Sequence, residues 1–541
     1  MLRSLLVVVV VTAVGGCRRE QKITPTRLTL GITAEPTSLV PMFGSSTADA
    51  EAGGLLFREL VARTANGVVA DLAVRVPTLG DGAVVDGDRL VVSWSLKADV
   101  RWSDGTPVTS ADIVAGWKVA LDDAQPVTTG RELANDVERI DVVDATHFRV
   151  VWRRPQPSFA APRVHRVLPA HLVLDESGAV KPLASYLRRP VGNGPFVIAE
   201  DVAGAHLLLR KRADVATGVD EVLVRYLSST ESLTSALLAN DIDCTFQNAG
   251  LSPTEAARLV AEHPGRFTVA RAPGNTWVHL DFNLDDPVLG DLRIRQAIAA
   301  AIDREKLIAA VANDAYDVDE GFLPRMHAAY MSRPHLAVEP ARSERLLDEA
   351  GFKRPAPGAV RVDKTGAALR LQIAAASGQR DTERLLTLVQ SALREVGIDV
   401  TLELRPFKVF FAEGARKRAL PHMAFYAWSI DVDSVGGSLW RADRIPSPGN
   451  NYSGQNFPGW RNAELTADLL AADNSLDEDL RRLTAKRANA LLLEELPALS
   501  FYFRPAVVVC RAGVTGVVPT GTLTPMAVSA AAWRAAPTTT P

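Results

Sequence analysis

The sequence has few cysteines, and none of them belongs to a pattern typical of metal binding. Only Cys17, Cys244 and Cys510 occur in 541 residues. No C-x-x-C pair and no Cys/His spacing indicates a zinc site. Cys244 and Cys510 both fall in expected strands, so one disulfide and two buried free thiols are both compatible with their positions. The sequence therefore predicts no bound metal.

An excess of charge of either sign is also absent. The chain has 60 basic and 63 acidic residues, a formal net charge of -3. This value gives no support to nucleic-acid binding, and it is too small to indicate cationic substrates. An apolar content of 47% and a charged content of 23% are typical of a globular protein, and the length predicts two or three domains.

Catalytic signatures are missing as well. The sequence contains no G-x-S-x-G, no G-x-x-x-x-G-K-[ST], no H-E-x-x-H and no G-x-G-x-x-G motif. Carboxylate pairs such as Asp285-Asp286 are inevitable among 63 acidic residues and do not indicate a glycosidase. The sequence therefore predicts a protein that is not an enzyme and has no cofactor.

Long apolar runs are absent except at the amino terminus. Residues 5–14 form one run, preceded by Arg3 and too short to span a bilayer. The run ends in V-G-G-C, and small residues directly before a cysteine resemble a lipoprotein signal box. We expect residues 1–16 to be a signal peptide, Cys17 to be the lipidated first residue and residues 17–26 to be a tether. The alternative is an ordinary signal peptide with a chance cysteine.

Local patterns predict both α and β structure. Residues 101–117 indicate a turn that leads into a helix, with Thr109 and Asp112 as a capping pair. Apolar runs on either side of residues 86–88 predict a hairpin. Residues 50–60 suggest a helix. Two strands, 369–373 and 398–404, flank a helix at 381–396 that ends at Gly397, so we expect a parallel β-α-β unit.

Several segments resemble, in the same order, the family 5 extracellular solute-binding proteins, the oligopeptide- and dipeptide-binding receptors of bacterial ABC importers. Residues 101–112, R-W-S-D-G-T-P-V-T-S-A-D, resemble the family's F-S-D-G-x-P-x-T-A-x-D. Residues 291–304 are similar to D-x-R-V-R-Q-A-x-x-x-A-I-D-R, and residues 428–431, W-S-I-D, look like W-x-x-D. Further similar segments are 35–41, 55–60, 191–196 and 344–352.

The resemblance implies an α/β fold of the periplasmic-binding-protein type, with two lobes, a hinge and an extra β-rich subdomain. Ligand would be enclosed between the lobes. We expect the hinge at residues 271–275, with a return crossover near Pro497. The implied boundaries are 27–60, 186–272 and 497–541 for lobe I, 61–185 for the β-rich subdomain and 273–496 for lobe II.

The resemblance also implies where ligand binds in lobe II. In peptide-binding relatives the carboxylate of W-x-x-D holds the ligand's α-ammonium, which corresponds to Asp431. An enclosed ammonium needs such a partner, because its desolvation is otherwise too costly. Trp428 would form a flat apolar wall, with Ser429 beside it. In the alternative interpretation Asp431 caps a turn, Trp428 is a core residue, and Asp433 takes the binding role.

Two further segments are expected at the cleft. The loop after Pro41 contributes ligand contacts in the family, which here corresponds to Ser45, Ser46 and Thr47; a plain surface loop is the alternative. Trp277 lies near the expected hinge and is predicted to line the cleft. His279 and Asp281, on the same expected strand, are interpreted as structural residues and not as metal ligands.

The sequence thus predicts an exported solute-binding lipoprotein, anchored through Cys17 and facing the periplasm or the cell exterior. It would be a monomer that captures an oligopeptide or dipeptide and delivers it to the permease subunits of an ABC importer. The alternatives are the same fold binding a sugar or a metal chelate, and a surface receptor or chaperone without a role in transport.

Overall fold

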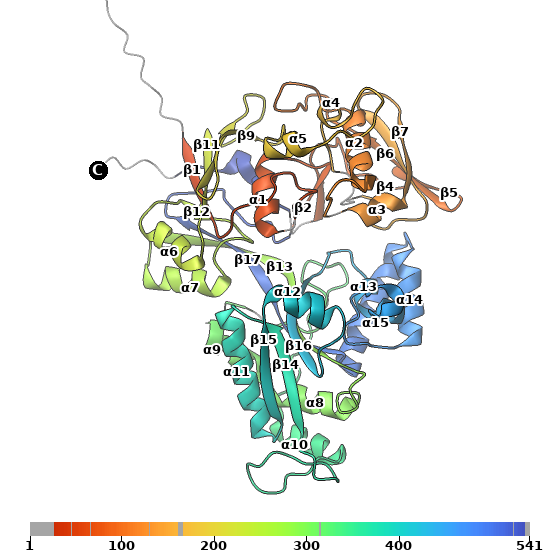
Figure 1. Ribbon diagram of the computed structural model, residues 1–541, viewed down its shortest axis with the longest axis vertical. Helices are drawn as coiled ribbons and strands as arrows, with labels where there is room; N and C mark the ends of the chain where they lie inside the picture. The colour runs from red at the N-terminus through yellow and green to blue at the C-terminus, as the bar shows by residue number, and fades with distance from the viewer. Residues whose placement is uncertain are drawn as a thin grey trace, which may run out of the picture.

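The computed structural model describes residues 26–535, apart from 45, 65–66, 129, 161–165, 313–314, 317 and 523. The expected signal peptide, Cys17 and Ser45 therefore lie outside the described residues. In Figure 1 the amino-terminal part of the chain forms the upper half of the molecule, and the middle of the chain, in green and cyan, forms the lower half. The upper half comprises lobe I with the β-rich subdomain, and the lower half is lobe II.

One mixed sheet of ten strands runs through both lobes. Its two longest strands, β13 and β17, lie next to each other near its middle, and β17 is buried along almost its whole length. A run of β-branched residues suits such a strand, since both of its faces pack against other elements. In sheet order the strands are β15 (Asp399–Arg405), β14 (Arg370–Ala376), β16 (Met423–Ser429), β13 (Phe267–Phe282), β17 (Ala498–Arg511), β12 (Cys244–Thr245), β1 (Arg27–Ile32), β11 (Glu221–Tyr226), β10 (His206–Lys211) and β9 (Phe196–Val202).

The antiparallel ladder between β13 and β17 is interrupted where the chain passes between the lobes (Figure 1). Its register shifts between Ala272 and Thr276, so that residues 273–275 stand opposite the single residue Pro505. We call residues 273–275 the hinge bulge. It falls within the segment 271–275 where the sequence predicts a hinge.

Sequence explains the interruption. Pro273 and Pro505 have no N–H to donate to the ladder. A Cβ on Gly274 would lie 1.8 Å from the carbonyl oxygen of Arg504, so only glycine permits this approach. The return crossing therefore lies at Pro505, and the expected position near Pro497 is wrong. β17 begins directly after Pro497 and continues through lobe II before it reaches the bulge.

Lobe I and the β-rich subdomain share one hydrophobic core, and the subdomain has its own five-stranded sheet. The predicted hairpin at 86–88 is confirmed, since β5 and β6 pair as antiparallel neighbours around it. The sheet consists, in order, of β4 (Thr78–Leu79), β5 (Gly82–Asp86), β6 (Arg89–Ser95), β8 (His147–Trp152) and β7 (Val137–Val142). A separate hairpin pairs β2 (Val61–Thr64) with β3 (Gly67–Ala70).

The helices of this upper half are mostly short. The predicted capped helix is confirmed: α2 begins after Thr109, whose backbone N–H donates to Asp112 Oδ2 at 2.7 Å. The helices are α1 (Thr47–Leu56), α2 (Ser110–Leu121), α3 (Arg131–Asp136), α4 (Ala170–Val173), α5 (Ala184–Arg188), α6 (Thr230–Leu238), α7 (Pro253–Glu262) and the 3-10 helix η4 (Met526–Ala532).

Lobe II contains the predicted β-α-β unit. β14 and β15 are parallel and are joined by the amphipathic helix α11, which ends before Gly397 in the left-handed region at φ +88°. The helices of lobe II are α8 (Leu292–Ala301), α9 (Arg304–Ala312), α10 (Pro340–Glu349), α11 (Arg380–Glu395), α12 (Phe407–Val409), α13 (Gly437–Trp440), α14 (Ala463–Asp473) and α15 (Glu478–Glu495). The short helices η1 (Phe410–Ala415), η2 (Ala442–Arg444) and η3 (Pro448–Asn450) complete it.

Cys244 and Cys510 form a disulfide. They are register partners on the neighbouring antiparallel strands β12 and β17, and both are buried. The bond therefore ties the carboxyl-terminal strand to lobe I, which decides between the two states that the sequence left open. Among the described residues, no helix combines the length and the apolar composition needed to cross a membrane.

Candidate functional site

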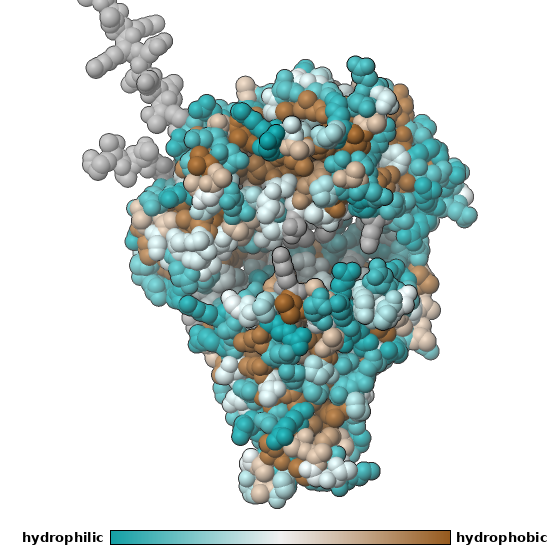
Figure 2. All heavy atoms as spheres, viewed as in Figure 1, coloured by the Kyte–Doolittle hydropathy of each residue, from teal (hydrophilic) through white to brown (hydrophobic). Residues whose placement is uncertain are grey.

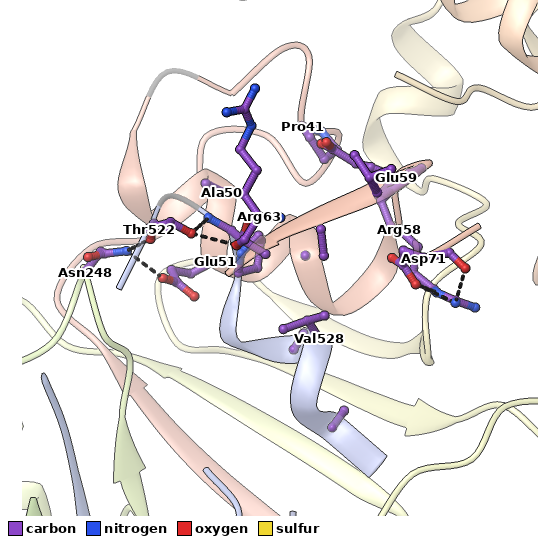
Figure 3. Close-up of a pocket in the computed structure, with 18 of the residues that line it drawn as sticks. Pro41, Ala50, Glu51, Arg58, Glu59, Arg63, Asp71, Asn248, Thr522 and Val528 are labelled. Carbon is purple, nitrogen blue, oxygen red and sulfur yellow. Dashed lines mark hydrogen bonds and ion pairs between the residues drawn. The ribbon is translucent and has the colours of Figure 1, made fainter. Parts of the chain in front are cut away.

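A cavity of about 620 Å³ lies where the lobes meet, and Figure 3 shows part of its wall. Helix α1, residues 57–63 and residues 522–531, which lead into and include most of η4, form most of that wall. Asp431 and Val432 come from lobe II, and Asn275 comes from the hinge bulge. Figure 2 shows the same face of the molecule hollowed at mid-height, between the two lobes. A molecule bound in this cavity would contact both lobes.

Two glycines let α1 serve as a cavity wall. A Cβ on Gly54 would lie 2.1 Å from Cβ of Pro525, and a Cβ on Gly53 would lie 2.9 Å from the carbonyl oxygen of Leu39. Larger residues would push α1 away from both neighbours. The helix therefore packs directly on the chain that leads into η4, and the two segments meet at the cavity.

The hydroxyl residues expected at the cleft begin this helix. Ser46 and Thr47 both line the cavity, whereas Ser45 lies outside the described residues. Ser46 is the N-cap of α1: its hydroxyl accepts from the backbone N–H of Asp49 at 3.1 Å, and Asp49 accepts from the backbone N–H of Ser46 at 2.9 Å. One role of Ser46 is thus to start the helix that forms the wall.

Asp431 lines the cavity from the lobe II side. It follows strand β16, and its position is set by the hinge bulge. The side chain of Asn275 donates to the carbonyl of Ile430 at 2.9 Å, and the backbone N–H of Ile430 donates to the carbonyl of Asn275 at 2.8 Å. This pair of bonds couples the position of the Asp431 carboxylate to the conformation of the hinge.

Asp433, the alternative binding residue, has a partner in the upper half of the molecule. Nη1 of Arg63 on β2 lies 3.5 Å from its Oδ1. Asp433 is absent from the described lining of the cavity, whereas Arg63 belongs to it. The structure therefore brings Asp431 to the cavity and Asp433 to an ion pair that bridges the lobes.

The other lobe II residues expected to contact ligand lie away from the described cavity lining. Trp428 is half-buried on β16, with its ring 5.5 Å from that of Phe457 and 6.3 Å from that of Phe411. Ser429 is exposed and pairs with Thr276 across the sheet. In this arrangement of the lobes, Trp428 belongs to an aromatic cluster of lobe II.

Trp277 is a core residue. Its side chain is fully buried, its ring stacks on His279 at 3.8 Å, and its indole N–H donates to Ser500 Oγ at 2.9 Å. The sequence interpretation that Trp277 lines the cleft does not match this position. The side chain projects from the strand into the interior of lobe II, where it packs against Trp440.

His279 and Asp281 lie in the same interior. His279 Nε2 is 3.4 Å from Asp281 Oδ1, and the hydroxyl of Tyr426 donates to Asp281 Oδ2. Burial raises the pKa of Asp281 to about 8 and lowers the pKa of His279 to about 3. Within the part of the chain that the structure describes, no three His, Cys, Asp or Glu side chains come together to hold a metal ion.

Glu51 is a cavity residue that our reading of the sequence missed. It lies on α1, lines the cavity and is only 2% exposed. Its Oε1 accepts from the side chain of Asn248 at 3.2 Å (Figure 3). Its Oε2 accepts from the backbone N–H of Met526 at 3.5 Å. Burial raises the pKa of its carboxyl group to about 7. The one sequence feature that sets Glu51 apart is its place in a helix made otherwise mostly of small and apolar residues.

Among the described residues that line the cavity are three arginines, and each is paired with a carboxylate. Arg58 contacts Asp71 at 2.5 Å (Figure 3), and Arg166 contacts Glu59. Arg63 contacts Asp433, as described above. The positive charges of the described lining are therefore matched by carboxylates of the protein itself.

Comparison with known proteins agrees with this architecture. Residues 68–444 match the family of bacterial extracellular solute-binding proteins, family 5, middle region. The chain is 22% identical over 360 residues to the nickel-binding periplasmic protein of Escherichia coli (strain K12), a match that covers 65% of this chain and 66% of that protein. It is 22% identical over 462 residues to the oligopeptide-binding protein AppA of Bacillus subtilis (strain 168), covering 82% and 80%.

Solved structures share the fold. The oligopeptide-binding protein of Thermus thermophilus, complexed with a pentapeptide, superimposes with a TM-score of 0.71 at 24% identity and covers 94% of each chain. NikA of Brucella suis, in complex with Fe(III)-EDTA, superimposes with a TM-score of 0.78 at 22% identity, covering 92% of this chain and 98% of that one. The predicted α/β fold of the periplasmic-binding-protein type is thus confirmed. Because the family match spans well over half of the 541 residues, this chain belongs to the bacterial extracellular solute-binding proteins of family 5, which serve ABC importers.

Proposed function

We propose that this protein captures a short peptide in the cavity between its lobes and delivers it to the permease subunits of an ABC importer. The observation that carries the proposal is the position of Asp431. It contributes a carboxylate from lobe II to a cavity whose wall otherwise comes mainly from the upper half of the molecule. It also occupies the acidic position of the family's W-x-x-D motif.

The chemistry suits a free amino terminus. A peptide's α-ammonium that leaves water for an enclosed cavity needs an anionic partner that accepts charge-assisted hydrogen bonds. A peptide held at Asp431 would also touch α1 and β2. Because only contacts with both lobes favour their closure, such a ligand would stabilise the closed form.

Metal chelates are the main competing ligands, since relatives include a nickel-binding protein and a complex with Fe(III)-EDTA. An anionic chelate would need unmatched positive charge in the cavity. The arginines of the described lining already contact carboxylates. Relatives of the same fold have been solved with a pentapeptide and with a nonapeptide, and a peptide brings a cationic α-ammonium to the cavity.

Calorimetry with two matched peptides tests the proposal. Trialanine carries an α-ammonium, whereas N-acetyl-trialanine has the same side chains without that charge. Losing one member of a charge pair that the closed lobes enclose costs about 3–5 kcal/mol, so we expect the acetylated peptide to bind at least about a hundredfold more weakly. In Asp431→Asn the two peptides should bind with similar affinity.

Asp433→Asn is the matched control, because it removes a carboxylate two residues away that is absent from the described lining. This variant should leave the ratio of the two peptides' affinities unchanged. If the two peptides bind equally well to Asp433→Asn but still differ in affinity for Asp431→Asn, the α-ammonium contacts Asp433 instead. Binding of a sugar or a chelate without any peptide binding would refute the peptide assignment and leave the solute-binding family intact.

The proposed cellular setting is the bacterial membrane, with the exported protein anchored as a monomer through lipid on Cys17 and facing the periplasm or the cell exterior. Two or three acyl chains on one cysteine hold a protein far more firmly than one. Mass spectrometry of the mature amino terminus checks this expectation. An unlipidated terminus at any other residue would contradict it. A neighbouring permease and ATPase in the genome would argue against a receptor or chaperone without transport.

A further inference from the structure

Glu51 is a buried charge-bearing group on the cavity wall that the proposed contact at Asp431 does not use. Its side chain lines the cavity at 2% exposure and accepts hydrogen bonds from the side chain of Asn248 (Figure 3) and from the backbone N–H of Met526. Both of these hydrogen-bond donors are neutral. A carboxylate at this depth is normally paired with a cation, because hydrogen bonds to amides offset only part of its desolvation cost.

The described cavity wall offers no cation to serve as that partner. Lysine and histidine are absent from the described lining residues, and the three lining arginines contact other carboxylates. The elevated pKa of Glu51 has the same origin, since burial disfavours its charged form. A cationic group that entered the cavity beside Glu51 would relieve this cost and gain charge-assisted hydrogen bonds.

We propose that Glu51 binds a cationic side chain of the ligand, the ammonium of lysine or the guanidinium of arginine, as a second anchor in addition to the α-ammonium at Asp431. The inference rests on the proposed peptide function and narrows it to basic peptides. It explains why a glutamate occupies a helix of small residues that packs closely on the segment leading into η4. A purely structural Glu51 that holds α1 against that segment would give no preference for basic ligands.

Two peptides that differ in one charge separate these roles. Ala-Lys-Ala and Ala-norleucine-Ala have side chains of similar length, but only the first carries a side-chain ammonium. In the wild-type protein at pH 8, where the Glu51 carboxyl is mostly ionised, we expect Ala-Lys-Ala to bind at least about tenfold more tightly. In Glu51→Gln, which keeps the shape of the side chain, the two affinities should agree within about twofold.

Asp431→Asn distinguishes this inference from the proposed function. This variant should weaken the binding of both peptides and leave the ratio of their affinities unchanged, because it removes only the contact with the α-ammonium that both peptides share. If Asp431→Asn has no effect but the ratio collapses in Glu51→Gln, the α-ammonium assignment fails and the Glu51 inference stands. Equal affinities in the wild-type protein, or an unchanged ratio in Glu51→Gln, would overturn the inference.

Two further measurements keep the test decisive. The ratio of the two peptides' affinities for the wild-type protein is measured without any substitution. It therefore tests the inference even if Glu51→Gln destabilises the fold. If neither peptide binds at about 1 mM, the peptide function fails, and cadaverine then tests Glu51 alone as a simple diamine. Cadaverine binding that weakens at least about tenfold in Glu51→Gln supports the inference, and absent or unchanged binding overturns it.

Discussion

Arg63 on β2, in the upper half of the molecule, and Asp433 in lobe II form an ion pair between the two halves, with Nη1 and Oδ1 3.5 Å apart. Because the pair joins the two lobes, it favours this arrangement over a more open one. Partly exposed pairs contribute at most about 1 kcal/mol, so Asp433→Asn should weaken peptide binding by up to about fivefold. Trialanine and N-acetyl-trialanine should lose affinity equally.

A double-mutant cycle with Arg63→Gln measures this pair directly. The coupling between Arg63 and Asp433 should shrink at high ionic strength, because exposed charges are screened. A coupling of zero at low salt would show that the ion pair has no part in holding the lobes.

The hinge bulge predicts how the lobes move. Residues 273–275 and Pro505 interrupt the ladder between β13 and β17, so rotation there breaks few hydrogen bonds. We expect the radius of gyration from small-angle scattering to fall when saturating trialanine is added. Asp431→Asn at the same peptide concentration is the control and should show a smaller change. An unchanged radius in the wild-type protein would refute ligand-driven closure.

Stability should depend on pH through the buried pair His279 and Asp281. The Asp281 pKa of about 8 lies above its usual value of 3.8, so between these values the folded state keeps a proton that the unfolded state has lost. The free energy of unfolding therefore falls as pH rises. Below pH 6.5 the lowered pKa of His279 has the opposite effect, so the contribution of Asp281 is clearest between pH 6.5 and 8.

Asp281→Asn tests this dependence, because it keeps an acceptor for Tyr426 and removes the titration. Between pH 6.5 and 8 we expect the free energy of unfolding, measured with urea, to fall by roughly 1–2 kcal/mol more in the wild-type protein than in Asp281→Asn. Glu51→Gln is a matched control: the pKa of Glu51 is about 7, so its loss of a proton also lowers the free energy of unfolding in this range, and this variant should keep the part that comes from Asp281. Equal slopes in the wild-type protein and Asp281→Asn would contradict the assignment.

The disulfide should matter for stability. Cys244 and Cys510 are 266 residues apart in sequence, and cross-linking such distant positions restricts the unfolded chain. We expect the double variant Cys244→Ala, Cys510→Ala to lose about 2–5 kcal/mol of unfolding free energy. The wild-type protein under reducing conditions should lose a similar amount. A reduced protein as stable as the oxidised one would show that strand pairing alone fixes β12 to β17.

Elements formed from adjacent segments could be predicted from the sequence. The capping pair of Thr109 and Asp112 and the β14-α11-β15 unit follow from local spacing and a glycine stop. Helix α1 shows where this reasoning fails. The sequence suggests a helix at 50–60, but the capping box at Ser46 starts it earlier and Phe57 is already extended. Tertiary contacts there override local helix propensity.

The candidate site was predictable only where a motif marked it. Asp431 and the segment at Ser46 and Thr47 reach the cavity, but Trp277 turns inward because neighbouring positions on β13 face opposite sides of the sheet. Glu51 could not be identified, since a helical glutamate is usually solvated. Only the packing of α1 on a segment hundreds of residues later in the chain buries it.

The position of β17 in the sheet has a consequence for the order of folding. This strand pairs with β13 and with β12, yet it begins only at Ala498. Until that stretch of chain is available, the strands on either side of it have open edges, and open edges favour pairing with other molecules. The end of the chain, and not its beginning, therefore decides when both lobes are complete. A product that stops before residue 498 would lack the strand that both lobes share.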